Sequence, residues 1–119
     1  MEDRSTVDRG ASAEVDATGA LLAAGYRIVE RNFACKAGEL DIVARDADVL
    51  VFIEVRSRRD GEHGHAAEMV SAAKRAQVTR VARIYLLARE PVFDECRFDV
   101  VAITGGVVEI IKDAWRSTS

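Results

Sequence analysis

The sequence predicts an α/β domain with a mixed central sheet flanked by helices, and three observations lead to this class. Short stretches rich in β-branched and apolar residues alternate with two longer stretches of helical periodicity. The 119 residues are 49% hydrophobic and 31% charged, a composition that suits one compact domain with a buried core. The predicted order is αβββαββ, in which the second helix is long enough to carry the fourth strand back beside an earlier one.

The first half of the chain predicts one helix followed by three strands. Residues 1–10 lack periodicity and are expected to form a flexible arm. Helix-forming residues then predict a helix over 11–24, which ends at Gly25, a residue type favoured just past a helix end. Three β-branched stretches separated by short polar connections predict an antiparallel meander. These strands are expected over 26–33, 39–45 and 49–56.

The second half of the chain predicts a loop, a long helix and a final hairpin. Two glycines in the segment RRDGEHGH predict a surface loop. Apolar residues at helical spacing predict a helix over 66–89, which Pro91 closes. Two further strands, joined by a Gly-Gly turn, are expected over 97–104 and 107–112.

Composition and cysteine usage exclude several classes of protein. One Pro and eight Gly exclude collagen-like and low-complexity chains. The predicted elements assign residues 11–115 to one domain and 116–119 to a tail. No apolar run approaches the roughly 18 residues needed to cross a bilayer. The N-terminus also lacks the pattern of a secretory signal, which predicts a cytoplasmic protein without a membrane partner. Cys35 and Cys96 lie far apart and outside any CxxC motif, so reduced, partly buried thiols are expected.

Two acidic residues occupy strand positions where burial normally excludes charge. Asp41 lies within GELDIV and Glu54 within LVFIEVR. Because side chains alternate along a strand, Glu54 is expected to share one face with Leu50, Phe52 and Arg56. A buried carboxylate must be paired with a cation, bind a metal or lie at the mouth of a cleft. The alternative interpretation is a structural pairing of these acids with arginines on an exposed face of the sheet.

Two further charged residues are predicted to point toward the core. On the first helix, Glu14 faces or borders the inward stripe, although the helix dipole alone also favours an acid in a first turn. On the long helix, Lys74 lies at the centre of the apolar stripe, whereas Arg80 and Arg83 lie on the far side. A single lysine there can also extend past the helix end to solvent. Together with the inward acids, however, Lys74 indicates a shared polar site.

The basic residues are clustered, although the chain as a whole is acidic. A net charge of −3 argues against a protein that coats nucleic acid by bulk electrostatics. Between residues 71 and 89, however, there are five basic residues and no acidic one, and a second basic group follows the third strand. One face of the protein is therefore expected to be basic. The candidate contacts to nucleic acid are Arg58, Arg59, Arg75, Arg80 and Arg83.

Other chemistry finds little support in the sequence. There is no GxGxxG, GxxxxGK[ST], GxSxG or HExxH motif, so nucleotide cradles, α/β-hydrolase chemistry and zinc proteolysis are not indicated. Asp99 in RFDVV shares a side of its strand with Arg97 and Val101. We interpret it as one partner of a local Arg97–Asp99 ion pair at a strand edge.

The strand acids carry a resemblance to a known group of enzymes. Asp41, followed after 12 residues by Glu54-Val55-Arg56, resembles the pattern of the restriction-endonuclease-like (D/E)XK nucleases. A wider set of features is similar to the YraN-like family of bacterial proteins, which itself resembles the archaeal Holliday-junction resolvases. These features are Glu14, GYRIVERNF, GELDIVARD, LVFIEVRSR, Lys74, ARIYLLA and RFDVVAIT, and they span roughly residues 13–111.

The resemblance implies a restriction-endonuclease-like fold and a magnesium- or manganese-dependent endonuclease that hydrolyses phosphodiester bonds. A hard, oxygen-ligated cation supplies charge neutralisation and an activated water in such a reaction. The family pattern makes Asp41 and Glu54 the metal ligands, with Glu14 as the supporting helix carboxylate. The expected partners are nucleic acid, DNA in particular, and a second copy of the chain in a homodimer.

The sequence departs from the family pattern at Arg56, which stands where a lysine is expected. An arginine stays protonated, so it can stabilise a phosphate but cannot act as a general base. One explanation is that Lys74 takes over the role of the lysine, which makes Glu54, Arg56 and Lys74 the candidate catalytic residues. The other is a non-catalytic module that binds nucleic acid or protein and retains the acids as an ion-pair network.

Overall fold

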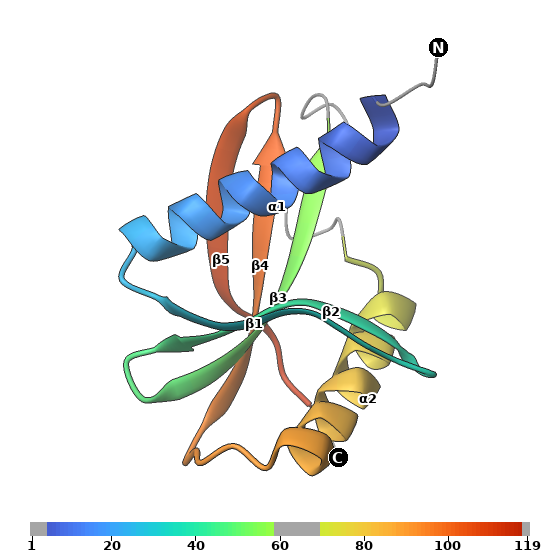
Figure 1. The fold of residues 1–119 in the computed structure, drawn as a ribbon, viewed down its shortest axis with the longest axis vertical. Helices are drawn as coiled ribbons and strands as arrows, with labels where there is room; N and C mark the ends of the chain where they lie inside the picture. The colour runs from blue at the N-terminus through green and yellow to red at the C-terminus, as the bar shows by residue number, and fades with distance from the viewer. Residues whose placement is uncertain (1–4, 59–69, 118–119) are drawn as a thin grey trace.

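The computed structural model describes residues 5–58 and 70–117, with side chains from residue 12 onward, and it confirms the predicted α/β order. Five strands form one sheet in the order β1-β2-β3-β4-β5, with α1 over one face and α2 over the other (Figure 1). This arrangement fits the restriction-endonuclease-like fold that the resemblance implied. The elements are α1 (Ser5–Ala23), β1 (Arg27–Cys35), β2 (Gly38–Asp46), β3 (Val49–Arg58), α2 (Ala72–Arg89), β4 (Cys96–Thr104) and β5 (Val107–Trp115).

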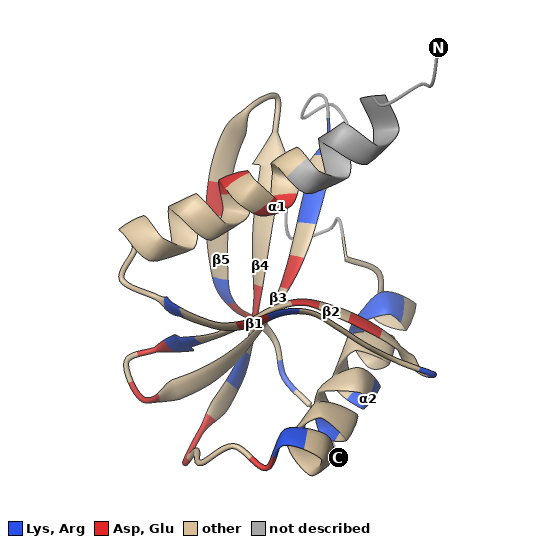
Figure 2. Cartoon of the chain, in the orientation of Figure 1, with Lys and Arg blue, Asp and Glu red and all other residues tan. Residues whose placement is uncertain are grey.

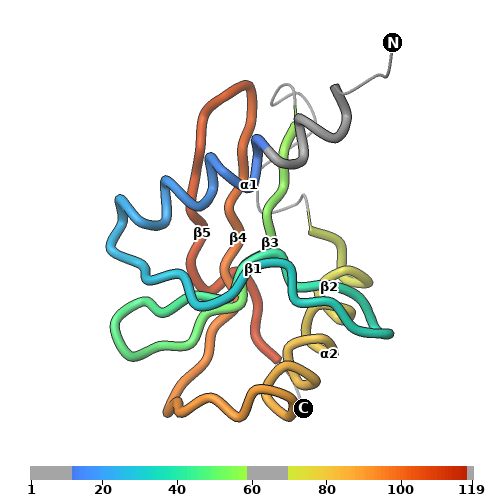
Figure 3. The backbone as a smooth tube through the Cα atoms, in the orientation of Figure 1, coloured from blue at the N-terminus to red at the C-terminus, as the bar shows by residue number. Residues whose placement is uncertain are grey.

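The sheet is mixed because one of its four ladders is parallel. β1, β2 and β3 form the predicted antiparallel meander, and β4 and β5 form an antiparallel hairpin. β3 and β4 run parallel, from the pair Leu50 and Cys96 to the pair Arg58 and Thr104. A parallel pair needs a long connection, and α2 lies within that connection, as the sequence predicted (Figure 3).

The sheet divides between β2 and β3. The ladder that joins these two strands ends at the pair of Ile42 and Ile53, whereas β3 continues beside β4 as far as Arg58. The β1–β2 hairpin therefore turns away from the outer half of β3 (Figure 1). We call this divergence the β2–β3 fork, and define it by Asp41 on β2 and Glu54 on β3.

Alternation along β3 supplies one core to each helix. Leu50 and Phe52 belong to the core under α2, while Val51 and Ile53 belong to the core under α1. All four side chains are buried. Each contributes about 1.5–3 kcal/mol relative to an exposed position, which fixes the register of this central strand. The same alternation places Glu54, two residues after Phe52, on the α2 face.

Both helices differ from the predicted bounds at their N-terminal ends. α1 begins at Ser5 rather than at residue 11, so residues 5–10 of the expected arm are helical. α2 begins at Ala72 rather than at residue 66, because Ser71 caps it by accepting a hydrogen bond from the Lys74 backbone N–H at 3.1 Å. Residues 66–69 lie outside the described residues.

The strands extend beyond their predicted ends, most of all β5. This strand continues to Trp115 rather than ending at Lys112. Asp113 adopts a left-handed conformation with φ of 55°, and the pairing with β4 shifts between Phe98 and Val100. The irregularity lets Trp115 pair with Phe98 again beyond the shift, so the sheet continues past the predicted end of this strand.

A close contact at the β1–β2 turn fixes the position of α2. The Gln77 side-chain amide donates a hydrogen bond to the Ala37 carbonyl oxygen at 3.0 Å. Gly38 has φ of 144°, and a Cβ atom there would lie 2.8 Å from the Gln77 amide nitrogen. Glycine at this position therefore permits the turn and the helix to meet.

A network of polar side chains surrounds Asp99, which is fully buried. Arg97 Nε donates to Asp99 Oδ1 at 2.8 Å, which confirms the predicted ion pair. Asp99 also accepts hydrogen bonds from the Tyr26 hydroxyl at 2.7 Å and from the Asp113 backbone N–H at 2.9 Å, while Arg97 reaches Asp46 at 2.8 Å. The expected position at a strand edge is wrong, because β4 lies between β3 and β5. This network joins the start of β1, the end of β2 and the irregular part of β5.

The structure also bears on the predictions made for the two cysteines and for membrane-spanning helices. Cys35 and Cys96 are both free thiols. Cys35 is half-buried as expected, whereas Cys96 is exposed. Within the described parts of the chain, neither helix is long and apolar enough to cross a membrane.

Candidate functional site

The Asp41 carboxylate closes the β2–β3 fork. Its Oδ2 atom accepts a hydrogen bond from the backbone N–H of Val55 at 2.9 Å. The β2–β3 ladder has already ended at Ile42 and Ile53, so this N–H has no backbone partner on β2. The side-chain oxygen of Asp41 thus replaces a carbonyl oxygen of β2 as the acceptor of the Val55 N–H. This hydrogen bond holds Asp41 beside β3.

Glu54 lies next to this carboxylate and is buried, with 3% of its surface exposed. It projects from β3 toward α2, as the alternation predicted. Burial raises the pKa of Glu54 to about 7, and the negative charge of Asp41 together with a hydrogen bond between the two side chains acts in the same direction. Lys74 and Arg56 act against this rise. Glu54 is therefore partly protonated near neutral pH, as expected of a buried acid beside a second acid.

Two cations flank the buried carboxylate. Lys74 Nζ lies 3.6 Å from Glu54 Oε2, and Arg56 Nε lies 3.5 Å from the same oxygen. The lysine reaches the sheet from the first turn of α2, so its inward direction is confirmed. Arg56 Nε is buried and has no hydrogen-bond partner among the described residues. Both cations thus sit at ion-pair distance, with donor capacity left for a ligand.

Glu14 approaches the fork from the opposite face of the sheet. Burial raises its pKa, and the charge of Asp41 raises it further, whereas Arg31 lowers it. The Glu14 Oε1 atom is buried without a hydrogen-bond partner among the described residues. An acceptor in this state favours an external donor or cation as its partner.

A cavity of about 500 Å³ adjoins Glu14. Arg31 and Asn32 of β1 line it, and neither was suggested by the sequence as part of a site. Asn32 and Asp41 lie between the paired positions Arg31–Ile42 and Phe33–Leu40 of the β1–β2 ladder, and Asn32 has φ of 59°. A non-glycine residue in this conformation is uncommon, and asparagine tolerates it best, which is the one sequence signal that was available.

The carboxylates meet the chemical requirements of a metal site better than its geometric ones. Among the described residues, no group of three or more His, Cys, Asp and Glu side chains is placed to hold a metal ion. The structure brings Asp41 and Glu54 into contact, and Glu14 is close enough to Asp41 to interact with it electrostatically. The buried Glu54 and the half-buried Asp41 repel each other, and an unpartnered carboxylate oxygen of Glu14 lies nearby. Carboxylate oxygens are the donors that Mg²⁺ and Mn²⁺ prefer. The type of donor atom therefore fits a divalent cation, and Asp41 and Glu54 are the residues that could hold it.

The candidate nucleic-acid contacts are distributed along α2 and the end of β3. Figure 2 shows Lys and Arg residues along α2. Arg80 and Arg83 are exposed on the side of the helix away from the core, as predicted. Arg75 and Arg58 are half-buried. Arg59 lies outside the described residues.

Comparison with known proteins shows the family. The model of "Uncharacterised protein family UPF0102" matches residues 13–103. The chain belongs to this family. It is the YraN-like family that the sequence resembles, and the matched region contains Glu14, Asp41, Glu54 and Lys74.

Relatives within UPF0102 are similar over most of their length. A UPF0102 protein of Chromohalobacter salexigens is 47% identical over 97 residues, which is 82% of this chain and 78% of that protein. A UPF0102 protein of Dechloromonas aromatica is 41% identical over 113 residues, or 95% and 92% of the two chains. A UPF0102 protein of Syntrophus aciditrophicus is 40% identical over 111 residues, or 90% and 87%.

Proposed function

We propose that this UPF0102 protein is a metal-dependent endonuclease that hydrolyses phosphodiester bonds in nucleic acid, with DNA as its partner. The observation that carries the proposal is the contact of Glu54 with both Asp41 and Lys74 at the β2–β3 fork. Placing two acids and a lysine together in a largely apolar setting lowers the stability of the fold. A purely structural role does not explain why this arrangement is present. Such perturbed groups are typical of functional sites.

Each residue of the site has a distinct role in this proposal. Asp41 and Glu54 would hold a Mg²⁺ or Mn²⁺ ion, which would neutralise the phosphate charge and make a water more acidic. Lys74, held beside Glu54, orients the attacking water. Arg56 stays protonated and stabilises the phosphate oxygens. Glu14 supports the metal side of the site through its orphan oxygen.

A second candidate function is a module that binds nucleic acid without cutting it. The ion pairs of Glu54 with Lys74 and Arg56 favour this function, because they compensate the carboxylate charge without a metal. A cytoplasmic location and a homodimer belong to both candidates and stay predictions.

A cleavage and binding panel separates the two candidates. Linear and branched DNA and RNA are incubated with the protein in Mg²⁺, in Mn²⁺ and in EDTA. We expect metal-dependent products from the wild type, none in EDTA, and none from Asp41→Asn. Glu109→Gln, which neutralises an exposed acid on β5, is the matched control and should cleave like the wild type. Retained binding without products on any substrate contradicts the nuclease and supports the binding module.

A further inference from the structure

We propose that a groove on the outer side of α2, the arginine groove, binds the phosphodiester backbone of nucleic acid without reading its bases. The inference rests on the proposed nucleic-acid function but concerns a surface other than the β2–β3 fork. The groove has a volume of about 630 Å³ between α2 and the chain that follows β5. The polar side chains that line it are Arg75, Thr79, Arg80, Arg83, Arg116 and Ser117.

The charge of the arginine groove indicates a phosphate ligand. Four of its lining residues are arginines, and none of the described lining residues is acidic. This concentration occurs on a chain whose net charge is −3, so it does not follow from overall composition. Guanidinium groups are always protonated and present paired N–H donors that match phosphate oxygens. The ligand expected here is therefore an oxyanion of the phosphate type.

The segment after β5 organises the groove. Arg83 Nη2 donates a hydrogen bond to Ser117 Oγ at 3.0 Å, and Trp115 Nε1 donates to Thr79 Oγ1 at 3.1 Å. The Arg75 guanidinium lies 5.9 Å from the centroid of the Trp115 ring. These contacts hold the C-terminal segment against α2 and orient two of the arginines before any ligand arrives. Orientation in advance lowers the entropy that binding has to overcome.

The spacing of the arginines suits a polymer rather than a single phosphate. Arg75 and Arg83 are eight positions apart on α2, and at 1.5 Å per residue this separation is about 12 Å along the helix. Successive phosphates of one strand of a DNA duplex rise by about 3.4 Å along its axis, so roughly three or four phosphates pass along this length. A run of phosphodiesters engages more of the groove than any mononucleotide.

The aromatic residue in the groove is not free to stack on bases. The Trp115 ring stacks on Phe98, with 4.9 Å between ring centroids and 17° between the planes. The Arg75 guanidinium lies over the same ring. Base recognition by stacking needs an open ring face, and a base would have to compete with Phe98 and Arg75 for this ring. Binding through the arginine groove is therefore expected to be independent of base sequence.

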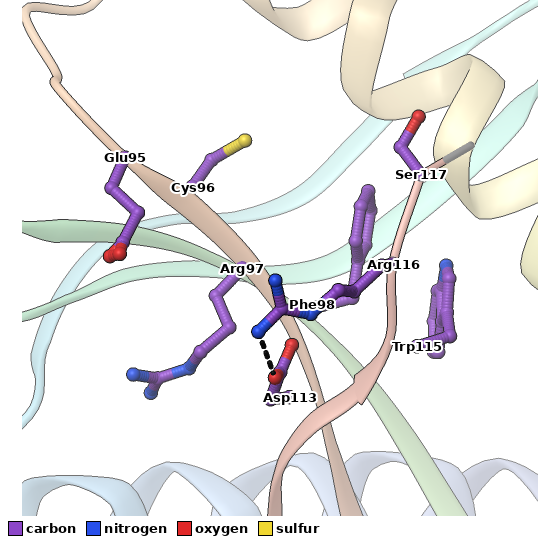
Figure 4. Close-up of a pocket in the computed structure, with 8 residues that line it drawn as sticks. All are labelled: Glu95, Cys96, Arg97, Phe98, Asp113, Trp115, Arg116 and Ser117. Carbon is purple, nitrogen blue, oxygen red and sulfur yellow. Dashed lines mark hydrogen bonds and ion pairs between the residues drawn. The ribbon is translucent and has the colours of Figure 1, made fainter. Parts of the chain in front are cut away.

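A neighbouring cavity on the other side of the C-terminal segment does not suit the same ligand. This cavity has a volume of about 320 Å³ and is shown in Figure 4. Glu95 and Asp113 line it together with Arg97 and Arg116, and Arg116 Nη2 pairs with Asp113 at 2.9 Å. The mixed charge repels a polyanion as much as it attracts one. The arginine groove is therefore the surface that the charge distribution favours.

The only tryptophan of the chain, Trp115, provides a direct readout of this groove. Wild-type protein is titrated with an unlabelled DNA duplex in EDTA while Trp115 emission is recorded, and a parallel titration follows the anisotropy of a labelled duplex. We expect both signals to change with the same midpoint. Affinity should fall as salt is raised, because phosphate contacts release counterions.

Two single charge reversals localise the binding. Arg80→Glu lies in the groove, and Arg27→Glu is the matched control, since it makes the same change in net charge at an exposed position on β1. We expect Arg80→Glu to weaken binding by about tenfold or more and Arg27→Glu by roughly threefold or less. Equal effects of the two variants, or binding that leaves Trp115 emission unchanged, overturn the proposal. Circular dichroism confirms that both variants fold.

Two further comparisons complete the test. Duplexes of different sequence but equal length should bind within about twofold, and a larger preference contradicts backbone recognition. Glu109→Gln should bind in EDTA as the wild type does, because Glu109 lies on β5 outside the groove. If neither the wild type nor any variant cleaves but Arg80→Glu still loses affinity, the result contradicts the proposed enzyme activity and supports the arginine groove. If cleavage occurs and Arg80→Glu binds normally, the result contradicts the arginine groove and supports the enzyme activity.

Discussion

Lys74 Nζ and Glu54 Oε2 lie 3.6 Å apart, although one residue belongs to the first turn of α2 and the other to the middle of β3. The contact brings an amine to the carboxylate from a different element than the one that carries Arg56. A helix that crosses the face of a sheet can thus deliver a lysine that the strand itself does not contain. This relationship makes the roles of the two cations separable by mutation.

Lys74→Ala should abolish metal-dependent cleavage, whereas Arg56→Lys should leave it equal or raise it. A lysine can orient water and accept a proton when neutral, and an arginine cannot. Single-turnover cleavage of the best substrate measures both variants, with Lys36→Ala in the exposed β1–β2 turn as the matched control. A Lys74→Ala protein that cleaves as fast as wild type refutes this role for the lysine.

Glu54→Gln should stabilise the protein above neutral pH. The pKa of Glu54 is about 7 in the folded protein, above its ordinary value of 4.5. Between these values the folded state binds the extra proton, so this group makes the protein less stable as pH rises through the window. Removing the charge should raise the free energy of unfolding by about 1–3 kcal/mol at pH 8 and by much less at pH 4.5.

Urea denaturation at the two pH values measures this difference. Glu109→Gln serves as the control, because its side chain is exposed and its substitution should change stability by less than about 0.5 kcal/mol at either pH. The same effect of Glu54→Gln at both pH values contradicts a raised pKa as its cause.

Mn²⁺ should stabilise the wild type and not Asp41→Asn. A ligand that binds only the folded state at ten times its dissociation constant adds about 1.4 kcal/mol of stability. For a chain of this size the melting temperature should then rise by several degrees, roughly 3–6 °C. Calorimetric titration gives the heats directly. Identical, negligible heats for the two proteins contradict the metal site.

Asp99→Ala should be among the most destabilising single substitutions. Asp99 is fully buried and accepts hydrogen bonds from Arg97, Tyr26 and the Asp113 backbone. Its loss leaves Arg97 with Asp46 as its remaining carboxylate partner and removes the acceptor of the Tyr26 hydroxyl and of the Asp113 N–H. We expect a loss of about 3–5 kcal/mol. Arg116→Ala removes an ion pair at an 83% exposed side chain and should cost less than about 1 kcal/mol. Chemical denaturation compares the two, and equal losses are inconsistent with a buried network.

Two glycines should respond to alanine in opposite directions. Gly19 lies in α1, and a Cβ atom added there would meet no other atom within 4 Å, so Gly19→Ala should stabilise by about 0.5–1 kcal/mol through helix propensity. Gly38→Ala meets the Gln77 amide and a positive φ, and should destabilise by about 1–2 kcal/mol. Thermal melts of both variants provide the measurement. Stabilisation by Gly38→Ala contradicts the close contact of α2 with the turn.

The sequence predicted side-chain directions correctly where a regular period determines them. The alternation of β3 placed Glu54 and Arg56 on one face, and the helical spacing of α2 turned Lys74 toward the sheet; both directions are confirmed. Asp41 shows where this reasoning ends. Leu40 and Ile42 have the same parity but belong to different cores. The strand is therefore irregular at Asp41, and a fixed period does not reveal that its side chain bonds to Val55.

The C-terminal part of the arginine groove was missed for a related reason. The predicted strand ended at Lys112, because Asp113 interrupts the run of β-branched and apolar residues. In the structure, the left-handed Asp113 absorbs the irregularity and the pairing resumes at Trp115. The burial of Asp99 was equally hidden, because partners such as Tyr26 come from distant parts of the chain. Sequence patterns report local geometry, whereas these contacts depend on how separate elements meet.

The parallel pairing of β3 with β4 has a consequence for when the site appears during folding. Leu50 pairs with Cys96 and Arg58 with Thr104, so every pair in this ladder encloses α2 within its loop. The antiparallel hairpins close over short loops and form early, while this long loop closes slowly. Lys74 docks beside Glu54 only when the crossover has closed. A chain still emerging from the ribosome therefore lacks the lysine–carboxylate pair until β4 has been synthesised.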